Sequence, residues 1–484
     1  MSFKPVFALR RVSIVALCLL AAACSQDGAG TSQNIMLTAL DVAQPQGWDD
    51  DLALNIPVDI NPDPDILEIE LDARLADVEI LPGQTTPAWT YGGSIPGPLI
   101  RAKVGDRVIV HFRNDLPEAT SIHWHGLRVP NEMDGVPGVT QDPVEAGGTF
   151  RYEFTVRDAG TYWYHPHINS AAQVGWGMYG PIVVDDPADP EAFGDDLVLV
   201  LSDMSLYEDG AFHPADTGGS FGDLFGREGT VLLVNGKVEP RLRVRQGKQQ
   251  RWRIINAARA RYFDLRVRDH NFVWLGGDNG LAARSEERYR VLVTPGERAD
   301  LVFTPTDAPG STRLVRWVPT DRGYGTTFSR TREPLLHIDT VEDAPVAPAQ
   351  IPEVLREIDP IDISEAVETT LDMTISLSNN DVTMGFNNVP YWRMEPIEAR
   401  VGETHVWTLR NPTDFAHPFH LHGYFFQVLD SERIPEWKDT VNVGVGEELR
   451  IAVEFDERPG MWMYHCHILD HAEVGMMGQL HVAE

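Results

Sequence analysis

One sequence unit occurs three times in this chain, and this repetition limits the folds that the chain can adopt. The copies start at Gly92 ("GGSIPGPLIRAKVGDRVIVHFRNDL"), Val234 ("VNGKVEPRLRVRQGKQQRWRIINAA") and Phe386 ("FNNVPYWRMEPIEARVGETHVWTLRNPT"). Each copy has a turn near Gly or Asn, a proline, a second turn with glycine, an alternating strand and a closing asparagine. A spacing of about 150 residues is that of whole domains rather than of a solenoid. The sequence therefore predicts three similar domains.

The expected secondary structure is almost entirely β. Short runs rich in Val, Ile, Thr, Tyr and Phe are separated by Gly, Pro, Asn and Asp, and no long segment of helical period competes with them. This pattern predicts an all-β protein made of β-sandwiches. Connectors rich in Pro and Asp or Glu start at Asp185 and Glu342 and mark the boundaries. The expected segments are a polar tether at 25–65 and domains at 66–186, 195–341 and 365–484.

Residues 1–24 are typical of an export signal. Lys4, Arg10 and Arg11 precede the apolar run "VSIVALCLLAAAC", which is too short to span a bilayer. The end of this run resembles a bacterial lipoprotein processing site, which implies a lipidated Cys24 as the mature N-terminus. Simple cleavage near Ala23 is the alternative, and the adjacent arginines leave both Sec and twin-arginine export open. We expect a periplasmic protein, with membrane attachment through Cys24 if that residue is lipidated.

The charge of the chain is strongly acidic. Asp and Glu outnumber Lys and Arg by 72 to 40, which gives a formal net charge of -32. Nucleic acid is therefore not an expected partner, because its binding requires a basic surface. The acidity is typical of a solvated surface, and the alternative is an acidic rim that attracts cations such as metal ions.

Only one cysteine lies in the expected folded body. Cys18 lies in the signal and Cys24 at its end, so that Cys466 alone remains and no internal disulfide is expected. A lone thiol in an exported protein is at risk of oxidation unless a metal holds it as a thiolate. Cys466 lies between His465 and His467, and alternation along a strand directs the cysteine to one face and both histidines to the other.

Ten of the 16 histidines form four tight groups: "HWHG" (His123, His125), "HPH" (His165, His167), "HPFHLHG" (His417, His420, His422) and "HCHILDH" (His465, His467, His471). One His-x-His pair is weak evidence for a metal site, but four groups are strong evidence. Two groups fall in the first domain and two in the third, so a metal cluster is expected where these domains meet. The second domain is expected to act mainly as a spacer and as one wall of a substrate site. The isolated histidines are expected to be surface or hydrogen-bonded residues: His111, His213, His270, His337, His405 and His481.

The residue types favour copper. A thiolate, two imidazoles and a distant thioether suit a blue-copper electron-transfer site, and the third domain offers His417, Cys466, His471 and Met476. Structural zinc is the alternative, but zinc sites usually close with four strong ligands and rarely use thioether sulfur. The alternative for Met476 is that it is a core residue and not a ligand. The other eight histidines are too many for one ion and fit a multinuclear cluster.

The motifs HxHG, HxH, HxxHxH and HCHx3Hx4M, their order and the three repeats resemble the three-domain multicopper oxidases, the laccase and cuprous oxidase family. The resemblance extends from about residue 66 to the end. It implies three cupredoxin-like Greek-key β-sandwich domains and four copper ions. It implies a type 1 copper held by His417, Cys466, His471 and Met476. It further implies a type 2 copper on His123 and His420, and a type 3 pair on His125, His165 and His467 and on His167, His422 and His465.

The resemblance also implies an activity. Such an enzyme takes single electrons from a reducing substrate at the type 1 copper and reduces dioxygen to water at the trinuclear cluster, with Cys466 linking the two centres. Asp134 lies eleven residues after His123, where the family carries an acidic residue, and a proton-relay role is expected for it. The alternative for Asp134 is a turn aspartate before Gly135.

One position departs from the family pattern. Several bacterial relatives carry Glu directly after the type 1 histidine as a second proton donor, and Ala472 takes that place here. Glu473 would face the other way on a strand, and Asp470 is another candidate.

The electron donor stays open between a phenol, Cu(I), Mn(II) and Fe(II). No methionine-rich insertion is visible among the 12 methionines, which argues against a dedicated cuprous oxidase in metal tolerance without excluding it. Residues 387–394, "NNVPYWRM", are expected either to line an exposed edge of the type 1 copper site where a phenol could bind, or to be core residues.

The alternative class of protein is a non-catalytic envelope protein of the same fold, which the intact motifs disfavour. A two-domain copper nitrite reductase is disfavoured by the third repeat.

Overall fold

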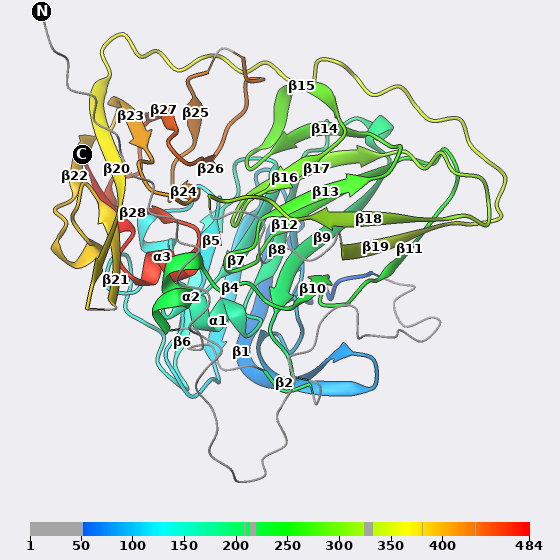
Figure 1. Ribbon diagram of the computed structural model, residues 1–484, viewed down its shortest axis with the longest axis horizontal. Helices are drawn as coiled ribbons and strands as arrows, with labels where there is room; N and C mark the ends of the chain where they lie inside the picture. Colours follow the sequence, from blue (N-terminus) through cyan, green and yellow to red (C-terminus); the bar gives the residue numbers. More distant parts are fainter. Residues whose placement is uncertain (1–51, 208–209, 213–218, 324–332, 380, 431) are drawn as a thin grey trace, which may run out of the picture. The chain divides into compact units, whose positions relative to one another are not determined.

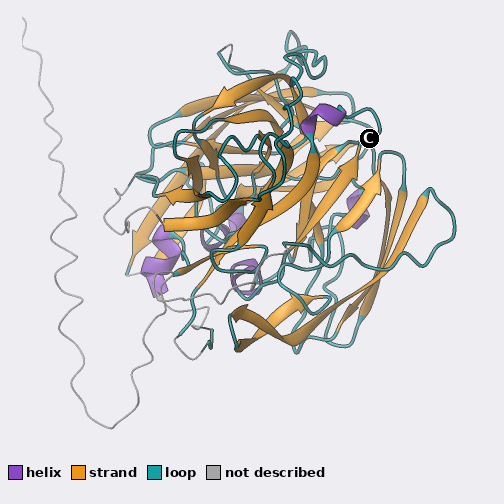
Figure 2. Cartoon of the chain, turned by 90° about the vertical axis from the view of Figure 1, so that its right-hand side faces the viewer, coloured by secondary structure: helices purple, strands orange, loops and turns teal. Residues whose placement is uncertain are grey.

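The computed structural model describes residues 52–207, 210–212, 219–323, 333–379, 381–430 and 432–484. The expected export signal, Cys24 and the first part of the expected tether lie outside the described residues. In the described part, strands form six sheets, which pair into three successive β-sandwiches (Figures 1 and 2). The prediction of an all-β protein with three sandwich domains is confirmed.

The first sandwich contains residues from Ile66 to Asp185. One sheet has the order β2-β1-β4-β6, with β1 (Ile66–Leu81), β2 (Gln84–Tyr91), β4 (Arg107–Asn114) and β6 (Thr149–Thr155). The facing sheet has the order β3-β8-β7-β5, with β3 (Ile100–Lys103), β5 (His123–His125), β7 (Gly160–His165) and β8 (Gly180–Asp185). Two histidine groups therefore lie on or directly after neighbouring strands of the second of these sheets.

The second sandwich contains no cluster histidine. Its larger sheet has the order β10-β9-β12-β17-β14-β15, with β9 (Asp195–Met204), β10 (Val231–Val234), β12 (Gln250–Asn256), β14 (Phe272–Gly277), β15 (Gly280–Arg288) and β17 (Arg298–Phe303). Its other sheet has the order β11-β19-β18-β13-β16, with β11 (Arg241–Val244), β13 (Phe263–Val267), β16 (Val291–Val293), β18 (Thr312–Val318) and β19 (Glu333–Thr340).

The third sandwich carries the other two histidine groups. One sheet has the order β21-β20-β23-β27-β25, with β20 (Val367–Ser378), β21 (Asp381–Phe386), β23 (Thr404–Arg410), β25 (Phe426–Val428) and β27 (Glu448–Glu454). The facing sheet has the order β22-β29-β28-β24-β26, with β22 (Ile397–Arg400), β24 (His417–Leu421), β26 (Thr440–Val443), β28 (Gly460–Cys466) and β29 (Met477–Ala483).

The helices of the described residues are all short. Three α-helices, α1 (Ser170–Gly175), α2 (Gly219–Phe225) and α3 (Leu469–Glu473), come from the three different domains and lie together in Figure 1. Three 3-10 helices are η3 (Asn131–Met133), η4 (Glu191–Phe193) and η5 (Tyr391–Arg393). Because α3 contacts both α1 and α2, the three domains meet beside the loop that follows Cys466.

The closing asparagine of each repeated unit has one structural role. Asn114, Asn256 and Asn411 are all buried at the ends of β4, β12 and β23. Each side-chain amide donates to a carbonyl four or five residues later and to a second carbonyl 30 to 37 residues away. Each side-chain oxygen accepts the N–H two residues on. A buried backbone loop requires such partners, which explains why each copy ends in asparagine.

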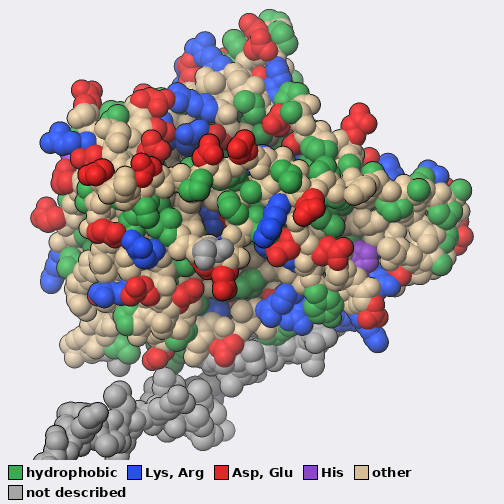
Figure 3. Space-filling model, turned by 90° about the horizontal axis from the view of Figure 1, so that it is seen from above, with side chains coloured by type: hydrophobic (Ala, Val, Ile, Leu, Met, Phe, Trp, Pro, Cys, Tyr) green, Lys and Arg blue, Asp and Glu red, His purple; other side chains and the backbone are tan. Residues whose placement is uncertain are grey.

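Each sandwich has its own apolar core, built by alternation along its strands. In β4 the sequence "RVIVHFRN" buries Val108, Val110 and Phe112 on one face. Charged residues lie outside, and the face in Figure 3 shows acidic and basic side chains intermixed rather than one acidic patch. Part of the expected tether is also packed, because Leu52 is buried and its carbonyl accepts a hydrogen bond from Asn235.

Candidate metal centres

Strand pairing brings the four histidine groups together. In the first domain β5 pairs with β7 so that His123 lies opposite His165. In the third domain β24 pairs with β28 so that His420 lies opposite His465. Histidines of the two domains then meet ring to ring, with His125 and His420 stacked at 3.8 Å between centroids. The cluster therefore lies between the first and third domains, as the motif distribution predicted.

The eight histidines fall into three groups whose ligand nitrogens lie within 4.8 Å of one another. Seven of the eight residues are buried, and His167 is half-buried. The groups are His123, His125 and His420; His125, His165 and His467; and His167, His422 and His465. The last two have the same members as the predicted type 3 sites, and the first contains both predicted type 2 residues.

The hydrogen bonds of these rings fit metal ligands. In five rings Nδ1 lies 2.8 to 3.0 Å from a carbonyl or carboxylate oxygen, which can only accept, so this nitrogen carries the hydrogen and Nε2 keeps its lone pair: His123, His165, His420, His422 and His465. Of these Nε2 atoms, those of His123, His165 and His420 have no hydrogen-bond partner among the described residues. Buried nitrogens rarely stay unpartnered, and a metal ion satisfies them.

Two further nitrogens face each other directly. His422 Nε2 lies 3.2 Å from His465 Nε2, although Nδ1 of each ring already donates elsewhere. A shared cation satisfies two lone pairs that face each other at this distance, and these nitrogens belong to one of the groups that could hold a metal ion. Burial lowers the pKa of most of the cluster imidazoles, to about 3 for His167. These rings are then neutral at physiological pH, which is the form that binds metal.

The third domain forms a separate thiol–imidazole site. Cys466 Sγ lies 3.6 Å from His417 Nδ1 and 3.6 Å from His471 Nδ1, and the two nitrogens are 3.1 Å apart. All three residues are buried. Burial raises the pKa of the Cys466 thiol to about 12, so a cation is needed to hold the thiolate at neutral pH. The buried Met476 belongs to the same loop, since its N–H donates to His471 O and its carbonyl accepts from Cys466 N.

Comparison with known proteins identifies the family. Multicopper oxidase family models match residues 73–189, 197–315 and 362–484, one for each sandwich. The multicopper oxidase MmcO of Mycobacterium tuberculosis is 30% identical over 439 residues, covering 83% of this chain and 84% of that protein. This chain belongs to the multicopper oxidase family. It is a copper oxidoreductase that uses dioxygen, and its three domains are cupredoxin folds.

Solved structures agree with this assignment. A multicopper oxidase from Campylobacter jejuni, described as a metallo-oxidase, superposes with a TM-score of 0.80 at 28% identity, covering 89% of this chain and 94% of that chain. A laccase from Pediococcus acidilactici superposes with a TM-score of 0.78 at 28% identity, covering 92% and 95%. The similar structures thus include one described as a metallo-oxidase and one named a laccase.

Asp134 lies at the cluster of this multicopper oxidase. Its Oδ2 accepts a hydrogen bond from His422 Nδ1 at 2.9 Å, and its carbonyl accepts one from His123 Nδ1 at 2.8 Å. Burial by itself raises the pKa of Asp134, but His422 and His123 hold it well below the usual range. The backbone also turns sharply after Asp134, because Gly135 has φ +82° and an added Cβ there would lie 1.8 Å from Ile122 O.

The acidic residues around Ala472 bond to other parts of the protein. Asp470 is fully buried, and its carboxylate accepts hydrogen bonds from the backbone N–H and the guanidinium of Arg227 at 2.6 Å. Glu473 Oε1 accepts the N–H of Ser170 at 2.7 Å, at the start of α1. In the described structure, neither carboxylate has a hydrogen bond to a cluster histidine.

The second domain also contacts the histidine cluster, in addition to the spacer role expected of it. Its Arg298 is buried and donates to Asp439 Oδ1 at 2.8 Å, and that oxygen lies 3.2 Å from His125 Nε2. Its Gly296 approaches the cluster so closely that an added Cβ would lie 2.8 Å from His467 Cδ2. No motif marks these residues, because a lone arginine or glycine has no spacing that reveals its partner.

The five isolated histidines of the described residues lie outside the metal groups, as expected. Four of them bond to carboxylates: His111 to Glu68, His337 to Glu239, His405 to Glu403 and His481 to Glu398. His270 packs against Phe303 with ring centroids 4.6 Å apart. His213 lies outside the described residues.

The aromatic segment at residues 387–394 borders the predicted type 1 loop. The Tyr391 N–H donates to Gly475 O at 3.0 Å, one residue before Met476. Trp392 is 59% exposed, and its ring lies 3.0 Å from where a Cβ on Gly475 would be. The neighbouring position fits the expectation that this segment borders the type 1 site.

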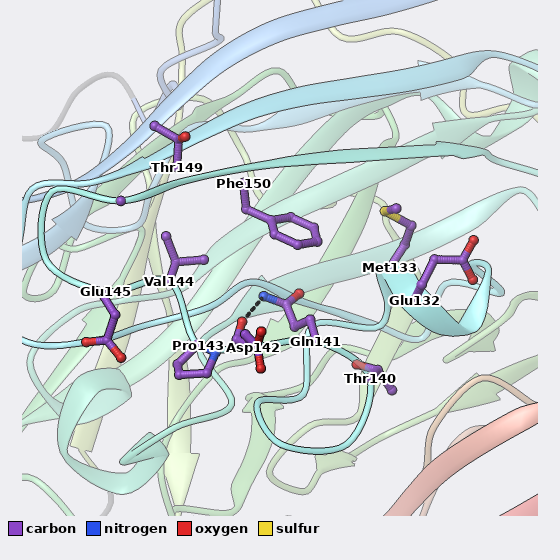
Figure 4. Close-up of a pocket in the computed structure, with 11 residues that line it drawn as sticks. Glu132, Met133, Thr140, Gln141, Asp142, Pro143, Val144, Glu145, Thr149 and Phe150 are labelled. Atoms are coloured by element: carbon purple, nitrogen blue, oxygen red, sulfur yellow. Dashed lines mark hydrogen bonds between the residues drawn. The ribbon is translucent and has the colours of Figure 1, made fainter.

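A cavity of about 490 Å³ lies in the first domain, outside the metal centres (Figure 4). It is bordered by Glu132, Met133 and the turn from Thr140 to Glu145, with Phe150 opposite them. Its lining includes none of the predicted metal ligands.

In the described residues, no helix has the length and apolarity to cross a membrane.

Proposed function

We propose that this multicopper oxidase holds four copper ions: a type 1 ion on His417, Cys466, His471 and Met476, and three on the eight His-x-His residues. The observation that carries this proposal is the placement of Cys466 between His465 and His467. Cys466 Sγ faces the thiol–imidazole site, while both flanking histidines belong to the histidine cluster. Copper supplies reversible one-electron redox chemistry at these positions.

The residues around these positions then have separate roles. Cys466 connects the two centres through the covalent backbone to its neighbours. The oxygens bonded to Nδ1 fix the tautomers of five cluster rings and so direct Nε2 toward the metal positions. The surrounding burial excludes water from the site.

Protons for water formation require an acid–base group at the cluster. We assign this role to Asp134, because its carboxylate bonds to His422 within the cluster. Asp470 and Glu473 bond instead to Arg227 and Ser170, and among the described residues neither carboxylate bonds to a cluster histidine.

The test separates an oxidase from a non-catalytic envelope protein of the same fold. We expect purified, copper-loaded protein to contain four coppers per chain by elemental analysis, to be blue, and to consume oxygen with Fe(II), Cu(I), Mn(II) or 2,6-dimethoxyphenol. A colourless protein without oxygen uptake would overturn the proposal.

We further propose export to the periplasm and attachment through a lipidated Cys24. The basic residues, short apolar run and "LLAAAC" sequence support this. Mass spectrometry of the mature N-terminus is the test. A lipidated Cys24 supports attachment, whereas an unmodified terminus near Ala23 indicates simple cleavage.

A further inference from the structure

One face of the strand pair β28 and β29 carries sulfur and imidazole donors that the predicted copper sites do not use. Alternation along β28 places Met461, Met463 and His465 on the same face. In the antiparallel register with β29, Met461 lies opposite His481, and His465 lies opposite Met477. The face that ends in a cluster histidine therefore begins with a methionine–histidine pair.

His481 has the hydrogen bonding of a metal-binding imidazole. Its Nδ1 donates to Glu398 Oε2 at 2.8 Å, so its Nε2 keeps a lone pair, and this nitrogen has no hydrogen-bond partner among the described residues. Along the strands, Glu398 is the neighbour of His481 on one side and Met461 on the other. A carboxylate bonded to one ring nitrogen fixes the tautomer and makes the other nitrogen a better metal ligand.

The sulfur atoms of Met461 and Met463 are also without hydrogen bonds. Met133 Sδ and Met394 Sδ each accept one, at 3.4 and 3.2 Å, whereas no donor in the described part of the chain bonds to the sulfur of Met461 or Met463. Met463 is 1% exposed, and Met461 is half-buried. The two thioethers therefore extend from the surface into the protein.

The side chains of Met461, Met463 and His481 can reach one ion. His481 is directly opposite Met461, where Cβ atoms lie about 4.5–5.5 Å apart, and diagonal to Met463, at a distance that long side chains still span. Methionine has three rotatable bonds, so its sulfur adapts to such a position. Thioether sulfur selects Cu(I), which imidazole also binds, whereas Mg, Ca and Mn prefer oxygen ligands. The three donors thus fit a Cu(I) ion.

The same face leads along β28 to the histidine cluster. Met463 O accepts the N–H of His422 at 2.9 Å, and His465 follows two residues after Met463. Met461 and His465 are four residues apart, which is about 13 Å along a strand. Met477, opposite His465, adds another thioether at the inner end. Soft ligands therefore occur at both ends of this path.

We propose that Met461, Met463 and His481 bind a further Cu(I) ion and that this ion supplies copper to the histidine cluster, a role that rests on the function proposed above. The metal stays Cu(I) in the transfer, because Cu–S bonds break as Cu–N bonds form and no electron moves. The site is separate from the predicted type 1 site, since Cys466 lies on the other face of β28.

The binding test uses copper-loaded protein reduced with ascorbate under anaerobic conditions, so that every resident copper is diamagnetic Cu(I). After dialysis against Cu(I) buffered by bicinchoninate, we expect about one copper per chain more than the resident number measured on the same sample. In protein labelled with 13C-methyl methionine, the methyl signals of Met461 and Met463 should shift on binding. Met461→Leu and His481→Gln should each lose the additional copper, and Glu398→Gln should weaken its binding by about 10–100-fold.

Two control variants match these changes. His337 Nε2 also bonds to a carboxylate, that of Glu239, but the strand neighbours of His337 are Leu314 and Arg241 rather than a methionine. His337→Gln should therefore keep the additional copper. Met204→Leu replaces a buried methionine of the second domain and should keep it as well.

The supply of copper is tested by the rate at which full-length, copper-free protein fills with limiting Cu(I). Met461→Leu should gain its resident coppers more slowly than wild type and Met204→Leu, and reach the same resident copper content at saturation. His481→Gln carries both tests if Met461→Leu does not fold, because the His481 side chain is 42% exposed and its replacement disturbs no core.

Three results would overturn the proposal. The first is a wild-type protein that holds no copper beyond the resident number. The second is an additional copper that persists in both Met461→Leu and His481→Gln, and the third is an equal filling rate in these variants and wild type. A protein without resident copper or blue colour would instead contradict the proposed function itself.

Discussion

Arg298 and Asp439 join the second domain to the histidine cluster. The guanidinium donates through both terminal nitrogens to the carboxylate, and both side chains are buried. Asp439 in turn contacts His125, and its backbone carbonyl accepts from His420 Nδ1 at 2.9 Å. A domain without predicted copper ligands thus fixes the position of two of them.

The first prediction concerns this pair. Arg298→Leu leaves Asp439 and the nearby Asp278 buried with less compensating charge, so we expect a loss of about 3–5 kcal/mol in unfolding free energy. Arg298→Lys keeps the charge but not the two-pronged geometry, and should lose less. Thermal unfolding and copper content measure the effect, with Arg241→Ala as the control. Equal stability of Arg298→Leu and wild type would contradict a positioning role.

The second prediction concerns Cys466. Cys466→Ser removes the thiolate that we propose to link the two centres, so we expect the blue colour and donor oxidation to disappear. Copper on the histidine cluster should remain, because its ligands are unchanged. Elemental analysis and the visible spectrum test this together. Oxygen uptake at the wild-type rate would show that the electron path does not pass through this residue.

The third prediction concerns Asp134. Asp134→Asn keeps the size of the side chain but removes its negative charge and its ability to carry a proton. We expect reoxidation of the reduced enzyme by dioxygen to slow by about 10²–10⁴-fold, while the blue colour is retained. Stopped-flow reoxidation is the measurement. Asp142→Asn is the control, since Asp142 lies exposed on the same loop, and a matching loss there would point to a general effect of the loop.

The fourth prediction concerns the repeated asparagines. Asn256→Ala leaves buried carbonyls at Arg261 and Val293 without their donor, which we expect to cost about 1–3 kcal/mol of stability. The exposed Asn271→Ala should change stability by about 0.5 kcal/mol at most. Chemical denaturation compares the two. A negligible loss at Asn256 would mean that the repeated asparagine is not a structural requirement.

Local patterns in the sequence were sufficient for the fold class and for the grouping of the candidate metal-binding residues. Alternation along a strand has a fixed period, so "HCH" had to direct Cys466 and its neighbours to opposite faces. The His-x-His spacing likewise placed both members of each pair on one side of their segment. Three repeats with the same turns and strands indicated three sandwiches, because the closing asparagine of each copy makes the same hydrogen bonds to the backbone.

Only the tertiary structure decided what surrounds those residues. Arg298 reaches Asp439 across 141 positions of the chain, and the Leu224 carbonyl reaches His471 across 247. Asp470, next to His471 in sequence, bonds to Arg227 rather than to the cluster. Such contacts depend on how the domains pack. They cannot be recognised in the sequence, because neither a backbone carbonyl nor a single charged residue forms a repeating pattern. The sequence by itself determined the candidate ligands, whereas packing between the domains determined their hydrogen-bond partners.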